Sequence, residues 1–486
     1  MITQESISQL KQFRQELYEA FDLRRDALME LIDALSSTPN ARSVVELSLS
    51  PFSRREYSSV HDAIAHFFQP SEPGKAGEEW RAWETKWVRL IAPYLPEPRR
   101  QKFWLFGTDV VPIPRPFAQT LADRTFVYQP NTIVRGNKPV TIGHQYAHLV
   151  FFPEKVEADD PPWVVPLVVR RVHSDEKATS MWAEQVEVLM KDETLPFHED
   201  LCVHVGDSVY SAVTALGPVA EQEYEHLVNV VRASGNRVFY HQPPPVEGKS
   251  DRGHPTWYGA RFDLQDPSTW DKPDEMQETI FTTRKKRIYR VRLEGWRNLL
   301  MRGKKGFPMH KYPFSLVRIR VLDEQSRPVY KRTMWLIVIG KRRHELSIVE
   351  AWEAYGQRYD VEHYFRFGKQ RLLMATYQTP DVEHEENWMW IVALADAQLW
   401  LARNVAESMP RPWEQYLPEA ESRTASPSTV QRDFGRIIRQ IGTPAQPPKP
   451  RGKSPGRATG EQPPLRERHP VIKKGKKSLN WPQTAC

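Results

Sequence analysis

The sequence has few cysteines, no long hydrophobic run and no nucleotide-binding loop, and each absence excludes a class of protein. Only Cys202 and Cys486 are present, so neither a disulfide framework nor a cysteine-based zinc site is expected. The most apolar stretch, Ile391 to Ala402, is interrupted by Asp396 and is too short to span a bilayer. There is no GxxxxGKS or GxxxxGKT loop, which argues against an ATP-dependent mechanism. The N-terminus has no basic region followed by an apolar one, so we expect no signal peptide and a cytoplasmic location.

Positive charge is concentrated at the C-terminal end. Residues 441–486 contain ten Lys or Arg against two Glu, a net charge of 10 − 2 = +8, while the whole chain carries +7. Nine prolines lie in the same stretch, a composition that does not bury enough apolar surface to fold alone. We therefore interpret it as a disordered basic arm able to contact phosphates without sequence preference, with a merely solubilising tail as the alternative.

The length of 486 residues predicts two to four domains. Residues 1–98 have apolar positions at helical intervals and are interpreted as a helical domain that either grips DNA ends or only packs. One catalytic domain is expected in two parts, residues 99–242 and 341–410, with an insertion between them at 243–340. A C-terminal helical segment at 411–440 and the basic tail at 441–486 follow.

Two predicted strands carry an aspartate. Phe103 to Val111 is an apolar run that we interpret as a strand ending in the carboxylate of Asp109, and Leu201 to Asp207 is a second buried strand with its carboxylate at the carboxyl end. Chemistry in open α/β sheets gathers beyond the carboxyl ends of strands. Each aspartate has a plain alternative as a turn former or helix cap, and Asp123 competes with Asp109 for the first position.

One predicted helix carries a polar stripe. Tyr355, Arg358, Glu362 and Lys369 stand at offsets of 0, 3, 7 and 14, and at about 100° per residue they fall on one face. Ser347 and the glutamate three residues later have the form of a capping box, so the helix is expected to begin near Ser347 and to continue past Lys369. A solvated face with charge pairs is the ordinary interpretation of such a stripe.

The spacing Y-x2-R-x3-E-x6-K matches the signature of the cut-and-paste DDE transposases of bacterial insertion sequences, and the chain resembles that family. The resemblance implies an α/β fold, an RNase H-like mixed sheet with flanking helices that is interrupted by a β-rich insertion. It also implies that Asp109, Asp207 and Glu362 are the catalytic metal ligands. Tyr355, Arg358 and Lys369 are then expected to bind DNA phosphates, Arg358 through a bidentate fork.

The resemblance further implies the cofactor and the partners. Phosphodiester cleavage by in-line attack uses two divalent cations about 4 Å apart, and Mg²⁺, for which Mn²⁺ substitutes, prefers carboxylate ligands. The expected partners are double-stranded DNA, as terminal inverted repeats and as target, and a second copy of the chain on that DNA. Neither a membrane nor a nucleotide cofactor is expected, and the location is the bacterial nucleoid.

The β-rich insertion holds one further candidate. Strand-like segments are predicted at Glu278 to Thr283, Lys286 to Leu293, Phe314 to Leu322 and Val329 to Gly340. In the last of them, Trp335 stands where hairpin-forming members of the family have a tryptophan that stacks on a flipped base, worth about 1–3 kcal/mol. A tryptophan that packs in the core is the equal alternative.

Other functions remain possible at this point. A non-catalytic DNA-binding relic of a transposase would bind ends without cutting them, and a general RNase H-like nuclease would cut DNA lacking inverted repeats. His144 and His148, with Glu154 nearby, suggest a metal site only weakly, because no HExxH motif or cysteine accompanies them.

Overall fold

The computed structural model describes residues 4–69, 76–129, 139–157, 160–244, 256–283, 287–407, 424–450, 456, 458–462 and 464–473. The predictions for residues 411–423 of the C-terminal segment and for 451–455, 457, 463 and 474–486 of the basic tail lie outside the described residues.

A ten-stranded mixed sheet runs through the described part of the chain, in the order β2-β3-β1-β5-β6-β12-β11-β10-β9, with β4 also paired to β3. A separate two-stranded sheet contains β7 (Val238–Tyr240) and β8 (Arg261–Asp263). The strands of the large sheet are β1 (Trp104–Pro114), β2 (Thr125–Tyr128), β3 (Val140–Phe151), β4 (Val165–Arg171), β5 (Cys202–Gly206), β6 (Leu227–Ala233), β9 (Glu275–Thr282), β10 (Ile288–Leu299), β11 (Phe314–Leu322) and β12 (Met334–Ile339).

The centre of the sheet is parallel. Strand β5 lies between β1 and β6 and runs parallel to both, and all its residues from Cys202 to Gly206 are buried. A continuous apolar run is typical of a parallel strand covered on both faces. These three strands therefore form the part of the sheet whose carboxyl ends can hold a site.

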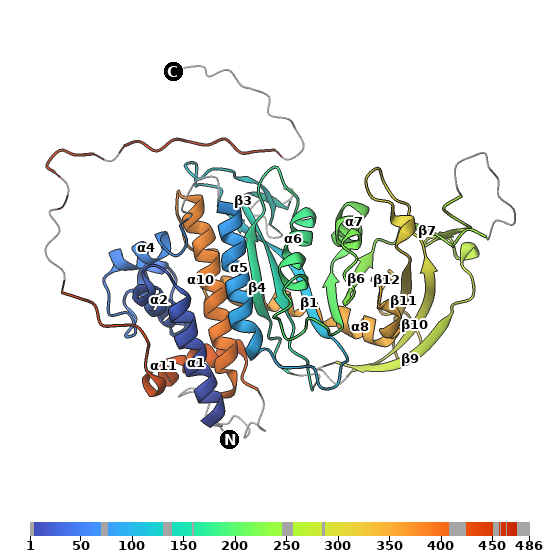
Figure 1. Cartoon of the computed structure of the whole chain (residues 1–486), viewed down its shortest axis with the longest axis horizontal. Coiled ribbons are helices and arrows are strands. Elements are labelled where there is room, and N and C mark those ends of the chain that lie inside the picture. The colour runs from blue at the N-terminus through green and yellow to red at the C-terminus, as the bar shows by residue number, and fades with distance from the viewer. Residues whose placement is uncertain are drawn as a thin grey trace, which may run out of the picture.

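The β-rich insertion extends this same sheet. Strand β12 pairs antiparallel with β6, and β11, β10 and β9 follow outward in order. Figure 1 shows them at the end of the molecule opposite the helical end. The insertion therefore shares a continuous backbone hydrogen-bond ladder with the catalytic part. The domain boundaries at residues 243 and 340 stay a prediction.

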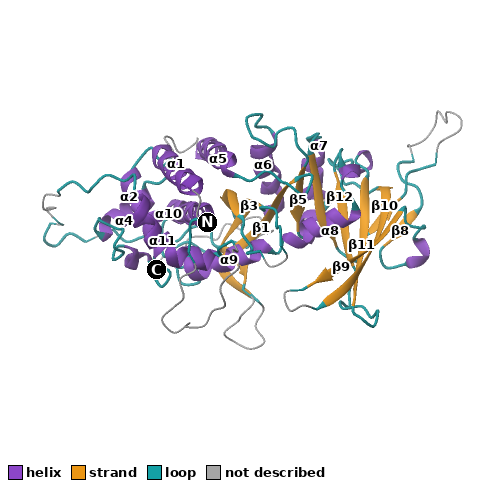
Figure 2. Cartoon of the chain, turned by 90° about the horizontal axis from the view of Figure 1, so that it is seen from below, coloured by secondary structure: helices purple, strands orange, loops and turns teal. Residues whose placement is uncertain are grey.

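Helices gather at the other end of the molecule (Figure 1 and Figure 2). There, helices from the beginning of the chain pack against helices from its end. The long helix α10 contacts α2, α4 and strand β4, and α11 contacts α2. The helices are α1 (Gln4–Ala20), α2 (Arg25–Ser37), α3 (Val44–Leu47), α4 (Tyr57–Ala65), α5 (Ala76–Ile91), α6 (Ala178–Met190), α7 (Val213–Glu221), α8 (Ile348–Gln357), α9 (Asp360–Arg371), α10 (Val382–Leu401) and α11 (Pro427–Ile441).

Buried polar contacts tie these helices into one unit. Arg14 of α1 forms an ion pair with Asp33 of α2 and donates to Gln398 of α10 at 2.7 Å. Gln431 of α11 donates to the backbone carbonyl oxygens of Leu35 and Arg371. The helical region of residues 1–98 thus shares its core with the C-terminal helices, and its boundary at residue 98 stays a prediction.

The predicted fold class is confirmed: a large mixed sheet with flanking helices, in an RNase H-like arrangement. Helix α10, from Val382 to Leu401, contains all but the last residue of the apolar stretch Ile391 to Ala402, and it packs on β4. In the part of the chain that the structure describes, no helix has the length and apolar character needed to cross a membrane.

Candidate active site

The signature stripe lies on two helices and not on one, so the prediction of a single helix is wrong. Helix α8 ends at Gln357 and α9 begins at Asp360. Between them the backbone tightens, because Arg358 and Tyr359 donate to the carbonyls three residues earlier, at 3.2 and 3.3 Å. Glu362 consequently lies in the first turn of α9. The beginning of α8 is as predicted, since Ser347 and Glu350 form a full capping box.

Asp207 lies directly after β5, at the carboxyl end of the buried parallel strand. Its backbone is extended, and its side chain accepts a hydrogen bond from the backbone N–H of Ser208, so the carboxylate caps the short helical turn that follows. This cap fixes the carboxylate above the sheet edge. The predicted position of Asp207 is confirmed.

Asp109 lies within β1 and not at its end. Strand β1 continues to Pro114, but its parallel neighbour β5 stops at Gly206, which is opposite Thr108. Asp109 is therefore the first residue of β1 beyond the end of β5. Asp109 is thus placed as it would be at the end of a strand, because it lies level with Asp207 on the neighbouring strand.

Electrostatics show that the three acids share one region. Burial raises the pKa of Asp109, and the charges of Glu362 and Asp207 raise it further, while Arg358 and the backbone N–H of Val110 act in the opposite direction. The side chain of Asp109 is 22% exposed. Mutual repulsion of carboxylates in a partly buried pocket is relieved by a bound cation.

The donor set suits a hard divalent cation, because all three candidate ligands are carboxylates. Among the described residues, however, no three His, Cys, Asp or Glu side chains stand close enough together to hold one ion. The guanidinium of Arg358 lies against Asp109 instead, with Nη1 3.0 Å from Oδ2. The carboxylates are thus gathered at one edge, with an arginine in ion-pair contact with Asp109.

The other residues of the stripe surround the same acids. The guanidinium of Arg358 lies over the ring of Tyr355, 5.7 Å from its centroid. Burial acts to lower the pKa of Arg358, but Tyr355 and the three carboxylates outweigh it and the pKa is raised. Burial lowers the pKa of Lys369, against the charge of Glu362. The structure therefore brings the predicted signature residues and the acids to one place.

Trp335 is the predicted site residue that does not join them. Its side chain is 2% exposed and contacts the rings of Trp270, Trp296 and Phe262, with centroids 5.3, 5.7 and 6.5 Å away. In this state Trp335 is a core residue. Base stacking by Trp335 stays a prediction, and it requires this aromatic cluster to open.

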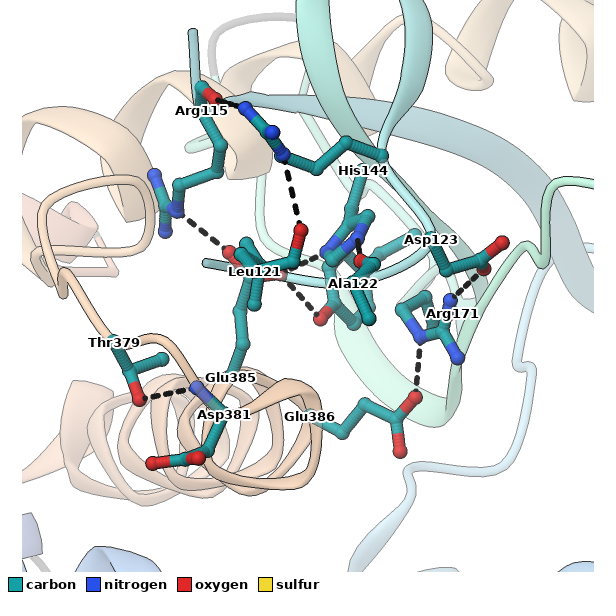
Figure 3. A network of polar contacts seen from close by, with 12 residues as sticks. Arg115, Leu121, Ala122, Asp123, His144, Arg171, Thr379, Asp381, Glu385 and Glu386 are labelled. Carbon is teal, nitrogen blue, oxygen red and sulfur yellow. Dashed lines mark hydrogen bonds and ion pairs between the residues drawn. The ribbon is translucent and has the colours of Figure 1, made fainter. Parts of the chain in front are cut away.

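Asp123 belongs to a different group of charges (Figure 3). Its carboxylate forms an ion pair with Arg171, which in turn pairs with Glu386, and it accepts from the backbone N–H of Ser174. Its backbone has φ of 58°. The acids that act on Asp109 are Glu362 and Asp207, so Asp123 has no place in the carboxylate group.

Glu385 forms the centre of a buried network in the same view (Figure 3). Its Oε1 lies 2.7 Å from Nε of Arg115, and its Oε2 contacts His144 and accepts from the hydroxyl of Tyr146 at 3.1 Å. Glu385 and Arg115 are completely buried. We call Arg115, His144, Tyr146 and Glu385 the Glu385 network. His144 is therefore a structural histidine.

One residue at the site, Arg232, was not predicted from the sequence. It follows Val231 on β6, and Val231 is paired with Gly206, so Arg232 lies level with Asp207. The positive charge of Arg232 acts on Tyr355 and favours its ionised form. Within the described residues Arg232 has neither an ion pair nor a hydrogen-bonded side-chain partner. The mostly apolar segment Leu227 to Val231, interrupted by Asn229 and followed by a cation, was the signal that could have identified it.

Comparison with known proteins agrees with this geometry. The family model described as DDE superfamily endonuclease matches residues 16–301, more than half of the chain. The matched segment includes Asp109 and Asp207, while Glu362 and its helices lie beyond it. No curated protein matches the chain. The family match and the paired strand aspartates lead to one conclusion: the chain belongs to the DDE superfamily endonucleases.

Proposed function

We propose that the protein is a DDE transposase that cuts DNA at the ends of an insertion sequence and joins the freed 3′-hydroxyls to a target. The proposal is supported by the position of Asp109 and Asp207 on neighbouring strands at the carboxyl end of β5, and by the charge of Glu362, which acts on Asp109 together with that of Asp207. The complete helix signature around Glu362 supports a transposase among the endonucleases of this family.

Asp109, Asp207 and Glu362 are the residues that would hold divalent cations, Mg²⁺ or Mn²⁺. When bound, the cations activate the attacking water or 3′-hydroxyl and stabilise the leaving oxygen. The chain's own cations hold the substrate: Arg358 exchanges Asp109 for a DNA phosphate, and its planar fork suits two phosphate oxygens. Lys369, near Glu362, and Arg232, level with Asp207, neutralise the neighbouring phosphates.

The test is a nicking assay on duplexes that carry or lack the element's terminal repeat, with Mg²⁺ or with a chelator. Glu362→Gln keeps the shape of the side chain but removes a ligand charge, and we expect cleavage to fall by about 10³-fold. Binding of end DNA by the variant should be retained. Equal cleavage by wild type and Glu362→Gln would refute the assignment.

A second candidate, a general DNA endonuclease, is favoured by the burial of Trp335 at 2% exposure. Such an enzyme has no need of a base-stacking tryptophan. It would cut duplexes with and without the terminal repeat at equal rates and would form no hairpin. The transposase proposal predicts cleavage at the repeat boundary and transfer of the cut strand to a second duplex.

A further inference from the structure

Part of the basic tail lies against the body of the protein. We call residues 464–473 the strap. Ile472 forms a parallel bridge with Thr125 of β2, and its backbone N–H donates to the carbonyl of Arg124 at 2.8 Å. The backbone N–H of His469 donates to Gln119 at 2.8 Å, and Arg466 forms an ion pair with Asp381 at 3.0 Å. The strap thus adds backbone contacts to the edge of the large sheet.

A buried arginine depends on the strap. Arg124 is 3% exposed and donates to the backbone carbonyls of Leu121, Arg115 and His469, at 3.0, 3.3 and 3.1 Å. Burial lowers its pKa, and within the described residues it has no carboxylate partner. An unpaired donor in such a site is costly. The carbonyl of His469 therefore completes the hydrogen bonds of Arg124 and holds the strap in one place.

The strap is reached from the carboxyl end of β1, the strand that carries Asp109. Pro114, five residues beyond Asp109 on β1, pairs with Gly143 of β3, which pairs with Thr125 of β2. At about 3.4 Å per residue along a strand and about 4.8 Å between strands, Ile472 lies on the order of 20 Å from Asp109. That separation corresponds to about six base pairs of duplex at about 3.4 Å each.

The charge of the strap suits a polyanion. It contains three basic residues, Arg466, Arg468 and Lys473, against Glu467. Arg468 and Lys473 are exposed and have no ion pair within the described residues. On β2 beside the strap, Phe126 and Tyr128 are 47% and 57% exposed. Cations next to exposed aromatic rings are typical of nucleic-acid binding surfaces.

We propose that the strap is a fixed DNA-binding element that contacts the phosphate backbone about six base pairs from the cut. The proposal rests on the proposed function, because the DNA is the substrate of the carboxylates. In this proposal the strap contacts a defined position on the duplex, in contrast to the disordered arm expected from the sequence. Arg468 and Lys473 supply the charge, and Arg124 and Thr125 supply the anchor.

The experiment uses the full chain with Arg468→Gln and Lys473→Gln together. The matched control, Lys11→Gln with Lys102→Gln, removes the same charge from exposed positions elsewhere, in α1 and just before β1. Binding of a duplex spanning the cut site is measured with a chelator present, between about 0.05 and 0.2 M salt. We expect affinity to fall at least tenfold in the strap variant, and the salt slope to decrease by about 1.8.

Two further readouts locate the contact. Chemical ethylation of phosphates about six base pairs from the cut should interfere with wild-type binding and not with binding by the strap variant. With Mg²⁺ present, the strap variant should show a raised KM for nicking with kcat unchanged. A merely structural strap would change neither the salt slope nor the ethylation pattern.

The outcomes separate the strap from the proposed function. If the strap variant binds DNA like the control variant, the proposal is overturned. Tighter binding or faster nicking by the strap variant also overturns it, because the strap would then be a cover over the site. If wild type binds through the strap but shows no metal-dependent cleavage, the proposed function fails while the strap proposal stands.

Discussion

The carboxylate site and the Glu385 network both combine carboxylates with an arginine, but within the described residues only the network is compensated. In the network, Glu385 has Arg115 and His144 against its two oxygens and Tyr146 as a third partner. At the site, Glu362 and Asp207 both act on Asp109, and among the described residues Asp109 is the acid with which Arg358 is in ion-pair contact. Paired charges, as in the network, hold the fold together, whereas carboxylates with too little counter-charge, as at the site, are able to bind a cation.

The pKa shifts of Glu385 and Asp109 reflect this difference, because they have opposite directions. Burial acts to raise the pKa of Glu385, but His144, Arg115 and Tyr146 outweigh it and the pKa is lowered. Burial raises the pKa of Asp109, and the net effect of its neighbours does not reverse that shift. The comparison predicts that substitutions in the network affect stability, whereas substitutions at the site affect DNA cleavage and binding.

The largest stability effect is expected from Glu385→Gln. The substitution keeps the volume but leaves the guanidinium of Arg115 buried without its counter-charge, which costs about 3–5 kcal/mol. The midpoint of urea unfolding should fall clearly. Glu383→Gln, an exposed neighbour on the same helix, is the control and should change stability by less than about 0.5 kcal/mol. An unchanged midpoint for Glu385→Gln would show that the network is not stabilising.

A smaller effect is expected from pH acting on His204, which is buried and has no charged partner within the described residues. Burial lowers its pKa to about 3 from the ordinary 6.5, and the ring contacts Thr108 Oγ1 at 2.9 Å. The folded chain keeps it neutral while the unfolded chain binds a proton, so its contribution to stability is present above pH 6.5 and is lost as pH falls toward 3.

At pH 5 the loss from His204 is about 2 kcal/mol relative to pH 7.5. The measurement is the urea midpoint at both pH values in wild type and in His204→Gln. The variant should lose less stability on acidification than wild type does. His344→Gln, at an exposed position, should behave as wild type, and equal acid sensitivity in all three proteins would contradict the account.

The smallest effect is expected from Arg232→Ala. Since Arg232 has no ion pair or hydrogen-bonded side-chain partner within the described residues, its removal should leave the unfolding midpoint unchanged. Loss of one phosphate contact should weaken DNA binding about tenfold at about 0.1 M salt and lower the salt slope by about 0.9. Arg290→Ala, an exposed cation on β10, should leave both quantities close to wild type. Unaltered binding by Arg232→Ala would remove Arg232 from the site.

Local patterns predicted part of the fold well. Strand β11 has the predicted bounds, Phe314 to Leu322. The capping box at Ser347 was also recognised, because its two partners are three residues apart. Such features depend on neighbours in the sequence, and a single sequence contains that information.

Features that depend on distant partners were missed. The ion pair between Arg115 and Glu385 joins residues far apart in the chain, and no spacing rule relates them. The pairing of β12 with β6 made the insertion part of the central sheet, and the pairing of β6 with β5 placed Arg232 beside the acids. The break between α8 and α9 escaped prediction because Arg358 and Tyr359 keep helical dihedral angles while their hydrogen bonds shift by one residue.

The central claim is that Asp109, Asp207 and Glu362 together bind divalent cations. A crystal structure of the full chain soaked with Mn²⁺, with anomalous scattering recorded, tests it most directly. The account predicts manganese peaks between these three carboxylates, with the guanidinium of Arg358 displaced from Asp109. Manganese at another acid group, such as Asp123 with Glu386, or an intact pair between Arg358 and Asp109 with no manganese nearby, would contradict it.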